Sequence, residues 1–404
     1  MYYGVEMSKF YIDSLKHFNT QTILMKSKLN IVMAWWWTWW HVFPIKSLID
    51  FILSSPQYSC KIKNLYRLWE KHSLEQKTFH NIKPSTFNCK FISILSGKYR
   101  RETPLKSRLK NIRDIFLFIA GIFQSLFWLI YLRVDVIFCK WWYVALPVVL
   151  AGAILRKKII VHESDTHPWL VNRVANRFAY KTFTGFDWVF DSWETVGQIL
   201  SDEIVVSSKD IQNWSKTLIQ DNFKKIITNL DRSKTWVLVT WWSQWSNRLY
   251  KSLQKVISQS QSLKSDFIFF FVLGLLNKDI KTLFKDMDNV YTFDFVSQKE
   301  MWMLCYLSDI AITRAGTTSL AEQKLYDMKI LMIPIPWTHD QYDNAKYYVQ
   351  KYKDIMIDQR DEQFLTKLGM SIRKFKNFKK NISSIDRLEQ IWKAKQIILK
   401  ELIG

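Results

Sequence analysis

The chain has little glycine: 10 residues in 404, against 20 tryptophans. Ordinary proteins contain about 7% glycine, and here glycine and tryptophan together reach about that fraction. Taken literally, the shortage excludes glycine-rich phosphate-binding turns, which need positive φ angles and close approach of a phosphate to the backbone. Yet the tryptophans gather where such turns belong. Residues 35–43 read WWWTWWHVF and directly follow a short apolar strand predicted for residues 31–34.

Two further groups of tryptophans also follow predicted strands. The sequence WWY at residues 141–143 follows a strand predicted at 134–138, and WWSQWS at residues 241–246 follows one at 237–240. Replacing Trp by Gly turns the three runs into GGGTGGHVF, GGY and GGSQGS, each a glycine-rich turn after a strand. We therefore hypothesise that the gene reads UGA as glycine and that these tryptophans stand for glycine. A genuine aromatic cluster is the alternative, but membrane-binding or base-stacking surfaces do not recur at strand-to-helix turns.

Cysteine is scarce as well. The four cysteines are scattered without a CxxC pair, so neither a zinc site nor a disulfide framework is indicated; they are Cys60, Cys89, Cys139 and Cys305. No Asp-x-Asp pair stands at the end of a predicted strand. We therefore expect no bound catalytic metal and no cofactor.

Acidic residues are outnumbered, with 36 Asp and Glu against 58 Lys and Arg and a net charge of +22. Such a charge implies an anionic partner, which is nucleic acid, anionic lipid or a pyrophosphate substrate. Neither a basic repeat nor a nucleic-acid motif is present, so we predict lipid and pyrophosphate and no nucleic acid. Residues 1–24 lack the apolar core of a signal peptide. We expect them to be an extension without structure or a mis-called start, because Met25 stands just before the first strand.

Six motifs appear in order once the glycines are restored. They read GGGTGGHVFP at 35–44, GGY at 141–143, HESDTHPGLVNR at 162–173, GGSQGS at 241–246, RAGTTSLAE at 314–322 and QYDNA at 341–345. In this order they resemble the MurG family, the peripheral membrane glycosyltransferases that add N-acetylglucosamine (GlcNAc) to undecaprenyl-pyrophosphoryl-N-acetylmuramoyl-pentapeptide in peptidoglycan synthesis. Each motif is weak alone. Six in the family's order, over roughly residues 28–350, are specific.

Strands and helices alternate in both halves of the chain, which indicates an α/β fold with a doubly wound parallel sheet in each half. The clearest predicted strands lie at 237–240, 267–273, 290–293, 309–313 and 330–334. The resemblance implies the GT-B arrangement, in which two Rossmann-like domains face a cleft. We expect an acceptor-binding, membrane-facing domain over residues 25–200 and a UDP-GlcNAc-binding domain over 201–375. An amphipathic helix within 376–404 ends the chain and, by resemblance, returns to the first domain.

The resemblance places UDP-GlcNAc in the second domain. Gly316 precedes a helix whose free N–H groups and positive dipole end can face the pyrophosphate; in the alternative, Ser319 or Thr318 is a plain N-cap. Glu322 matches the residue that accepts the ribose hydroxyls, although it is alternatively a helix-surface carboxylate. Gln341 matches the residue that holds the sugar hydroxyls. The remaining donor contacts that the family implies are Ser243, Val296, Thr317, Leu320, Ala321 and, in support of Gln341, Asn344.

On the acceptor side, the resemblance places Thr38 and the restored glycines at Trp39 and Trp40 near the diphosphate and the sugar. His41 is our candidate general base for the acceptor's C4 hydroxyl, because an imidazole pKa of about 6.5 suits proton removal at neutral pH. Its alternative role is to orient the acceptor pyrophosphate as a hydrogen-bond donor. Glu163 is the second candidate base. A single direct displacement would invert the anomeric centre.

Three positions depart from the family. Asp165 replaces the family's Asn and thereby exchanges an amide donor for a carboxylate that only accepts hydrogen bonds. Ser201 stands where the family has a phosphate-facing Arg. Asp340 precedes Gln341 in place of His or Gln. Asp165 and Ser201 still occupy substrate-binding positions of the family, so these changes bear on sugar orientation and phosphate neutralisation.

Residues 115–132 form a long apolar run in which only Gln124 and Ser125 are polar. A basic cluster precedes it, made of Lys106, Arg108, Lys110 and Arg113. A spanning helix needs about 20 apolar residues, but this run lies between two strands of one sheet, which spanning would split. We favour an interfacial helix, with one face on the sheet and the other on anionic lipid, over a fully buried crossover helix. The family implies peripheral association with the cytoplasmic face of the cell membrane.

Two other function classes stay open. A related GT-B enzyme that makes a diacylglycerol glycolipid would share the glycine loops and the membrane face. A non-enzymatic, basic, aromatic membrane-binding protein is the interpretation if the tryptophans are genuine. As written, the indoles of the turns should crowd the space between the domains and hide the substrate site. The tryptophans concerned are Trp36, Trp37, Trp39, Trp40, Trp142, Trp241, Trp242 and Trp245.

Overall fold

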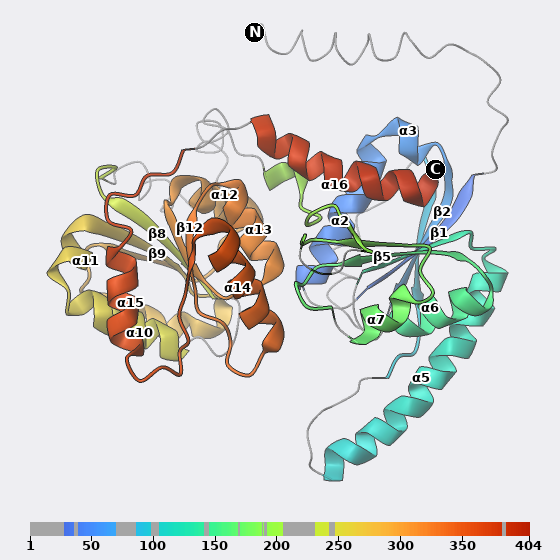
Figure 1. The fold of residues 1–404 in the computed structure, drawn as a ribbon, viewed down its shortest axis with the longest axis horizontal. Helices are drawn as coiled ribbons and strands as arrows, with labels where there is room; N and C mark the ends of the chain where they lie inside the picture. Colours follow the sequence, from blue (N-terminus) through green and yellow to red (C-terminus); the bar gives the residue numbers. More distant parts are fainter. Residues whose placement is uncertain are drawn as a thin grey trace, which may run out of the picture.

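The fold is described from a computed structural model. It covers residues 28–35, 39–69, 86–97, 105–140, 145–168, 170–187, 189, 192–204, 231–241, 247–381 and 385–404. Only the backbone is described at residues 39–42, 69, 105–109, 170–171, 275–276, 278, 339 and 385–388. The chain forms two α/β domains, and its last helix runs from one toward the other (Figure 1).

The first domain is built on a seven-stranded parallel sheet with the order β3-β2-β1-β4-β5-β6-β7. Its strands are β1 (Leu29–Trp35), β2 (Ile62–Trp69), β3 (Asn88–Ser93), β4 (Val136–Lys140), β5 (Lys158–Glu163), β6 (Lys181–Thr184) and β7 (Glu194–Thr195). Residues 31–35 of the inner strand β1 are all buried, as expected for a parallel strand covered on both faces. The strand order reverses beside β1, so the predicted doubly wound sheet is confirmed.

Helices cover both faces of this sheet. They are α2 (Trp39–Ser54), α3 (Pro56–Ser59), α5 (Leu105–Tyr131), α6 (Ala145–Ile154) and α7 (Leu170–Asn176). Apolar residues of α2 form one core with one set of strand side chains. Residues of α5, α6 and α7 form a second core with the opposite set.

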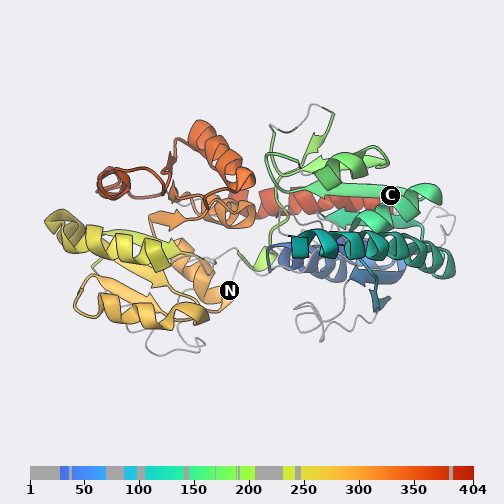
Figure 2. The same cartoon turned by 90° about the horizontal axis from the view of Figure 1, so that it is seen from below.

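The second domain repeats the plan with a six-stranded parallel sheet of order β10-β9-β8-β11-β12-β13. Its strands are β8 (Thr235–Thr240), β9 (Phe267–Val272), β10 (Val290–Phe293), β11 (Ile310–Thr313), β12 (Lys329–Met332) and β13 (Ile355–Met356). The helical elements are α10 (Asn247–Ser258), α11 (Gln261–Asp266), η3 (Leu275–Phe284), α12 (Gln298–Leu307), α13 (Thr317–Leu325), α14 (His339–Tyr352) and α15 (Phe364–Arg373). They again form a core on each face, and Figure 2 shows the two domains end to end.

The terminal helix α16 (Ile385–Ile403) joins the two domains. Its last two turns pack on α2 in the core of the first domain, through Ile398, Leu399, Leu402 and Ile403. The buried ammonium of Lys395 on α16 lies 2.7 Å from the carboxylate of Asp202 in the short helix η1 (Asp202–Ile204). The end of the chain is therefore part of the first domain's fold.

Helix α5 differs from every other helix in its setting, because it projects away from the first domain (Figure 1). Its residues Lys110–Tyr131 make up the one helix of the described chain that is long and apolar enough to cross a membrane, yet only 22% of its apolar window is buried. It nevertheless connects β3 to β4 of a single sheet. The expected crossover position is therefore confirmed, and the alternative of a fully buried crossover helix is wrong.

Candidate functional site

The candidate site lies where the carboxyl ends of parallel strands in the two domains come together. The loop after β5 in the first domain carries Asp165 and Thr166. In the second domain, Ala315 follows β11, and Asn344 lies on α14 after β12. This edge of a doubly wound sheet is where such folds bind ligands.

Asn344 connects these segments. Its side chain is 1% exposed. The amide oxygen accepts hydrogen bonds from the backbone N–H of Thr166 at 3.0 Å and from the Thr166 hydroxyl at 2.9 Å. The amide nitrogen donates to a carboxylate oxygen of Asp165 at 3.0 Å and to the carbonyl of Ala315 at 3.3 Å. One buried amide therefore ties the acceptor-side loop to the turn that begins α13.

Glu163 organises the same loop from within the first domain. Its buried carboxylate accepts the backbone N–H groups of Ser164 at 2.7 Å and Asp165 at 2.8 Å through one oxygen. The other oxygen accepts the side-chain amide of Asn172 at 2.7 Å. Burial raises the pKa of Glu163 to about 7, against the opposing effect of these hydrogen bonds. Because this carboxylate is buried and both of its oxygens accept hydrogen bonds, it fixes the shape of the loop. Its geometry does not support Glu163 as the second candidate for the general base.

Lys140, at the end of β4, supplies a positive charge beneath the loop. Its fully buried ammonium donates to the Ser164 hydroxyl and lies 3.2 Å from Nδ1 of His162. Because an ammonium only donates, Nδ1 accepts, and the His162 proton sits on Nε2, which donates to the carbonyl of Gly197 at 3.0 Å. Burial and the Lys140 charge hold the pKa of His162 well below its usual range, so this imidazole is neutral.

The loop carries two acidic residues, Glu163 and Asp165, and the cation that faces them, Lys140, lies outside the loop on β4. Burial raises the pKa of Asp165 well above its usual range, and the carboxylates of Glu163 and Asp340 raise it further. The Lys140 ammonium acts in the opposite direction on both acids of the loop. Sequence reasoning missed Lys140, although its position directly before the WWY turn was a signal.

The predicted pyrophosphate turn forms as expected on the backbone. Gly316 is the N-cap of α13 and makes no side-chain cap, so the N–H groups of the first turn are not capped by a side chain. Thr318 and Ser319 lie inside the helix, as does Thr317, so the alternative role of Thr318 or Ser319 as N-cap is wrong. Leu320 is fully buried in the core and Ala321 is partly buried.

Glu322, one turn into α13, points toward α12. Its carboxylate accepts a hydrogen bond from the side chain of Trp302, and burial raises its pKa to about 7. Its side chain is partly buried and bonded to Trp302, which disfavours the alternative of a free carboxylate on the helix surface. Val296, at the predicted uracil position, is buried in the same core as Trp302, beside the exposed ring of Phe295.

Gln341 lies in the first turn of α14. Its amide oxygen accepts the backbone N–H of Ile335 at 3.0 Å, which fixes the side chain and leaves its NH₂ group as a donor. Ser201, at the position of the missing arginine, accepts the N–H of Glu203 at 3.3 Å through its hydroxyl. The described residues thus place a fixed amide at the predicted sugar position and a hydroxyl at the predicted phosphate position.

A buried cation that the sequence interpretation passed over is Arg314, the first residue of the RAGTTSLAE motif. It is 7% exposed, and one terminal nitrogen donates to the carbonyls of Ile333 at 2.7 Å and Pro334 at 3.1 Å. Its guanidinium lies 5.4 Å from the ring of Trp241. Trp241 itself is buried against Tyr250, in the core that α10 and α15 form on one face of the second sheet. The expectation that this indole crowds the cleft is therefore wrong.

Several predicted residues lie outside the described part of the chain. Thr38 and Ser243 are not described, nor are the side chains of Trp39, Trp40 and His41. The backbone at 39–41 begins α2, directly after β1. The other tryptophans of the crowding prediction are likewise outside, at Trp36, Trp37, Trp142, Trp242 and Trp245.

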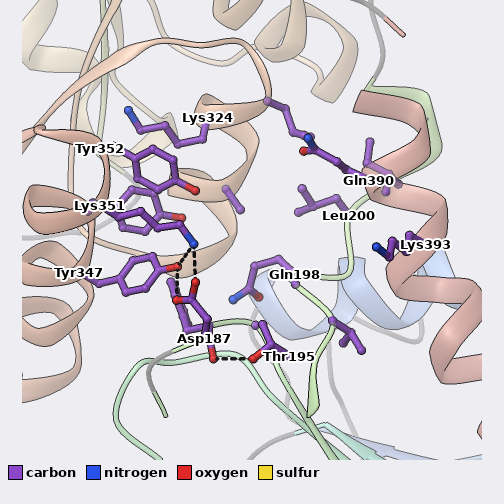
Figure 3. A pocket seen from close by; sticks show the side chains of 18 of the residues that line it. Asp187, Thr195, Gln198, Leu200, Lys324, Tyr347, Lys351, Tyr352, Gln390 and Lys393 are labelled. Carbon is purple, nitrogen blue, oxygen red and sulfur yellow. Dashed lines mark hydrogen bonds and ion pairs between the residues drawn. The ribbon is translucent and has the colours of Figure 1, made fainter. Parts of the chain in front are cut away.

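A separate cavity of about 770 Å³ opens between the domains and α16 (Figure 3). Asp187 of the first domain crosses it, bonding to Lys351 at 2.7 Å and to the Tyr347 hydroxyl at 2.8 Å. Among the predicted site residues whose side chains the structure describes, Ala321 alone contributes to its lining. The cavity therefore lies beside the described part of the candidate site.

Comparison with known proteins identifies both halves of the chain. Residues 41–184 match the glycosyltransferase family 28 N-terminal domain, and residues 237–398 match the family 28 C-terminal domain. A protein of Streptococcus mutans named UDP-N-acetylglucosamine–N-acetylmuramyl-(pentapeptide) pyrophosphoryl-undecaprenol N-acetylglucosamine transferase is 31% identical over 295 residues, covering 71% of this chain and 74% of the relative. A protein of the same name from Streptococcus agalactiae is 25% identical and covers 83% and 90%.

Solved structures share the fold. Acinetobacter baumannii MurG superposes with a TM-score of 0.66 at 16% identity, covering 93% of this chain and 99% of that one. The UDP-GlcNAc 2-epimerase of Neisseria meningitidis reaches 0.60 at 13% identity, covering 93% and 99%. The GT-B architecture is thus confirmed. With both family models matched in order over most of its length, this chain belongs to glycosyltransferase family 28 and, within it, to the MurG family.

Proposed function

We propose that the protein transfers GlcNAc from UDP-GlcNAc to the C4 hydroxyl of undecaprenyl-pyrophosphoryl-N-acetylmuramoyl-pentapeptide, with inversion at the anomeric carbon. The observation that carries the proposal is the buried Asn344 bridge, which brings the loop of the HESD motif against the turn of the RAGTTS motif. Two motifs far apart in the sequence thereby meet at the carboxyl edges of both sheets, where a donor and an acceptor have to meet.

On the donor side, the open first turn of α13 supports binding of the pyrophosphate. Thr317, Thr318 and Ser319 offer backbone N–H groups, and Leu320 and Ala321 anchor the helix. Glu322, held by Trp302, accepts the ribose hydroxyls, and the backbone at Val296 recognises the uracil. The NH₂ group of Gln341 holds the sugar. Ser243 and Ser201 complete the phosphate contacts.

On the acceptor side, His41 is the proposed general base. It stands at the start of α2, in the turn that follows β1. Thr38 and residues 39–40 of the same turn contact the acceptor diphosphate, and in the alternative His41 orients that diphosphate. The three hydrogen bonds accepted by buried Glu163 support a positioning role for this carboxylate. The proposed chemistry uses no bound metal or other cofactor.

Helix α5 supports the membrane-associated part of the proposal. Along its outer face stand Ile112, Ile115, Phe116, Ile119, Phe123, Phe127, Ile130 and Tyr131, each 45–68% exposed. Apart from the adjacent pairs 115/116 and 130/131, these positions follow one another at three- and four-residue intervals, which places them in one stripe. We name them the apolar stripe of α5. A contiguous exposed apolar surface of this size indicates a partner or a membrane.

Two polar residues of α5, Gln124 and Ser125, face the opposite way, toward the protein. The side chain of Gln124 accepts the N–H of Leu95 at 2.8 Å and donates to the carbonyl of Ser93 at 3.0 Å, and Ser125 is fully buried. A water-facing helix has the reverse pattern. Lys110 and Arg113, both exposed, flank the stripe and supply attraction to anionic headgroups. We infer a peripheral position on the cytoplasmic face of the membrane, where a lipid-linked acceptor is presented.

The test is a transfer assay with purified protein, labelled UDP-GlcNAc and a lipid-linked muramoyl-pentapeptide acceptor in detergent micelles. We expect transfer to this acceptor, unaffected by a metal chelator, and no transfer to diacylglycerol. Transfer to diacylglycerol alone would reassign the protein to glycolipid synthesis. Lack of transfer to either acceptor, in a protein that also fails to bind UDP, would leave only a non-enzymatic membrane-binding role.

A further inference from the structure

The loop of residues 163–166 contains more buried acid than its own chain segment can neutralise. Glu163 is fully buried and Asp165 nearly so. Asp340, on α14 of the other domain, adds a third negative charge that acts on Asp165. Buried carboxylates are costly unless a counter-charge or several hydrogen bonds compensate them. Glu163 accepts three hydrogen bonds, whereas among the described residues the Asp165 carboxylate accepts one, from Asn344.

Lys140 is the buried cation that faces this loop. It does not form a direct ion pair with Asp165; its ammonium bonds to the hydroxyl of Ser164, the preceding residue. Neutral His162 takes up a second position around the ammonium and carries no charge of its own. The Lys140 charge thus acts on the two acids of the loop at close range and in a dry environment, where electrostatic interactions are strong.

We infer that Lys140 is a positioning residue for sugar transfer: its buried charge compensates the carboxylate of Asp165 and thereby holds the loop in its contact with Asn344. The inference rests on the proposed function. Asp165 is the position where this chain departs from the family's Asn, and an amide there would need no counter-charge. Lys140 and Asp165 therefore act as a matched pair that joins the acceptor-side loop to the donor-side turn.

A double-mutant cycle tests the pair. Lys140→Met removes the charge and keeps an apolar side chain of similar length, and Asp165→Asn removes the acid that the charge compensates. We expect kcat of Lys140→Met to fall about 100-fold, the scale of a small misplacement of reacting groups, with little change in the KM for UDP-GlcNAc. Adding Asp165→Asn should restore kcat to within about tenfold of the parent, because the buried acid is then gone.

The pH profile gives a second readout that a merely structural lysine would not move. The charged groups that face Asp165 are Lys140, Glu163 and Asp340, on β4, β5 and α14. Without Lys140, only the protonated form of Asp165 fits its site. Burial lowers the pKa of Lys140 to about 8, so the parent keeps this charge only below that pH. Between about pH 7 and about pH 5, where the parent lysine is charged, the activity of Lys140→Met relative to the parent should therefore rise as the pH falls. In the double variant this dependence should disappear.

Lys395 provides the matched control, since it is also a buried lysine with a carboxylate neighbour, Asp202, but lies on α16. Lys395→Met should lose thermal stability without any rescue by Asp165→Asn. Hydrogen exchange reports on the loop without needing activity: the amides of Ser164, Asp165 and Thr166 should exchange faster in Lys140→Met and at the parental rate in Lys395→Met.

The possible results distinguish a failure of the proposed function from a failure of the Lys140–Asp165 inference. If the parent transfers no sugar, the proposed function fails, while loop exchange and thermal stability still test the pair. Equal losses in Lys140→Met with and without Asp165→Asn would overturn the inference. So would failure of both Lys140→Met proteins to fold, because Lys140 would then be structural irrespective of Asp165. Folding of only the double variant would support it.

Discussion

The side-chain amide of Asn344 donates a 3.0 Å hydrogen bond to the carboxylate of Asp165 across the boundary between the two domains. The same amide reaches Ala315 and Thr166. A second interdomain contact, between Lys351 and Asp187, is roughly half exposed at both ends. Buried hydrogen bonds are costly to break, whereas exposed ion pairs contribute about 0–1 kcal/mol. Of these two contacts between described residues, the Asn344 bridge therefore makes the larger contribution to the polar coupling of the domains.

Replacing Asn344 by Ala should lower kcat by about 10- to 100-fold while the protein still folds. The substitution leaves Thr166 and Asp165 without buried partners, at a cost of about 1–3 kcal/mol per unpaired group. The measurement is steady-state transfer together with thermal unfolding. As controls, Asn289→Ala removes a buried amide remote from the cleft, which bonds to Leu263 and Phe267 carbonyls, and should cost stability with kcat retained. Asp187→Ala should change neither by much. Equal kcat losses in all three variants would contradict the special role of Asn344.

Donor affinity should rise with pH through neutrality because of Glu322. Burial raises the pKa of this carboxyl from 4.5 to about 7, so the anion that accepts ribose hydroxyls accumulates only above that pH. The unfolded chain loses the proton near 4.5, so this group's contribution to stability is full below 4.5 and declines as the pH rises toward 7. We expect UDP binding, measured calorimetrically, to strengthen between about pH 6 and about pH 8.

Glu322→Ala should abolish that pH dependence and weaken donor binding far more than it destabilises the fold. Each lost hydrogen bond to the carboxylate is worth about 1.5–3 kcal/mol. The matched control is Glu300→Gln on α12, a buried acid in a capping box with Ser297, which should keep the pH dependence of UDP binding. Unchanged affinity in Glu322→Ala would refute the ribose contact.

Charging the apolar stripe of α5 should release the protein from membranes. Phe116→Glu with Phe123→Glu places two acids at positions that are each 68% exposed, so folding should be unaffected. Burying an exposed phenylalanine in lipid contributes about 1.5–3 kcal/mol, so sedimentation with phosphatidylglycerol vesicles should weaken at least about tenfold. Met370→Glu, at an exposed apolar site on α15, is the control and should bind as the parent does. Undiminished binding of the double variant would exclude α5 as the contact.

The structure also distinguishes tryptophans that the sequence could not. Trp337 adopts a left-handed backbone with φ of 67° and is 83% exposed, a conformation that glycine favours and a bulky residue pays for. Trp302 is buried and bonds to Glu322. We predict UGA at codon 337 and glycine in the native protein, and UGG at codon 302. Sequencing of the gene and peptide mass spectrometry of native protein test this. UGG at 337 and throughout the WWWTWW, WWY and WWSQWS runs would sink the recoding hypothesis.

The fold was largely predictable because its signals are local. Apolar strands and the turns after them mark β1, β4, β5, β8, β9, β10, β11 and β12. The interpretation missed β6, β7 and β13, which have four, two and two residues and are too short to show a periodicity. Hydrogen bonds between side chains far apart in the sequence could not be predicted; Thr166 and Asn344, for example, lie 178 residues apart. No local sequence pattern predicts that the Glu163 carboxylate accepts hydrogen bonds from its own loop, or that Lys140 lies beneath that loop.

The anchoring of α5 has a consequence for how far from a bilayer the reaction takes place. A Cβ at Gly121 would lie 2.2 Å from the carbonyl oxygen of Leu95, and Gln124 bonds to both sides of the same segment. The helix is thus clamped to the end of β3 and cannot swing independently of the sheet. If the stripe rests in lipid as proposed, the rigid attachment of α5 to the sheet fixes the distance between the cleft and the lipid headgroups. The length of the pyrophosphate and sugar above the membrane then becomes a selection criterion for the acceptor, separate from any contact in the cleft.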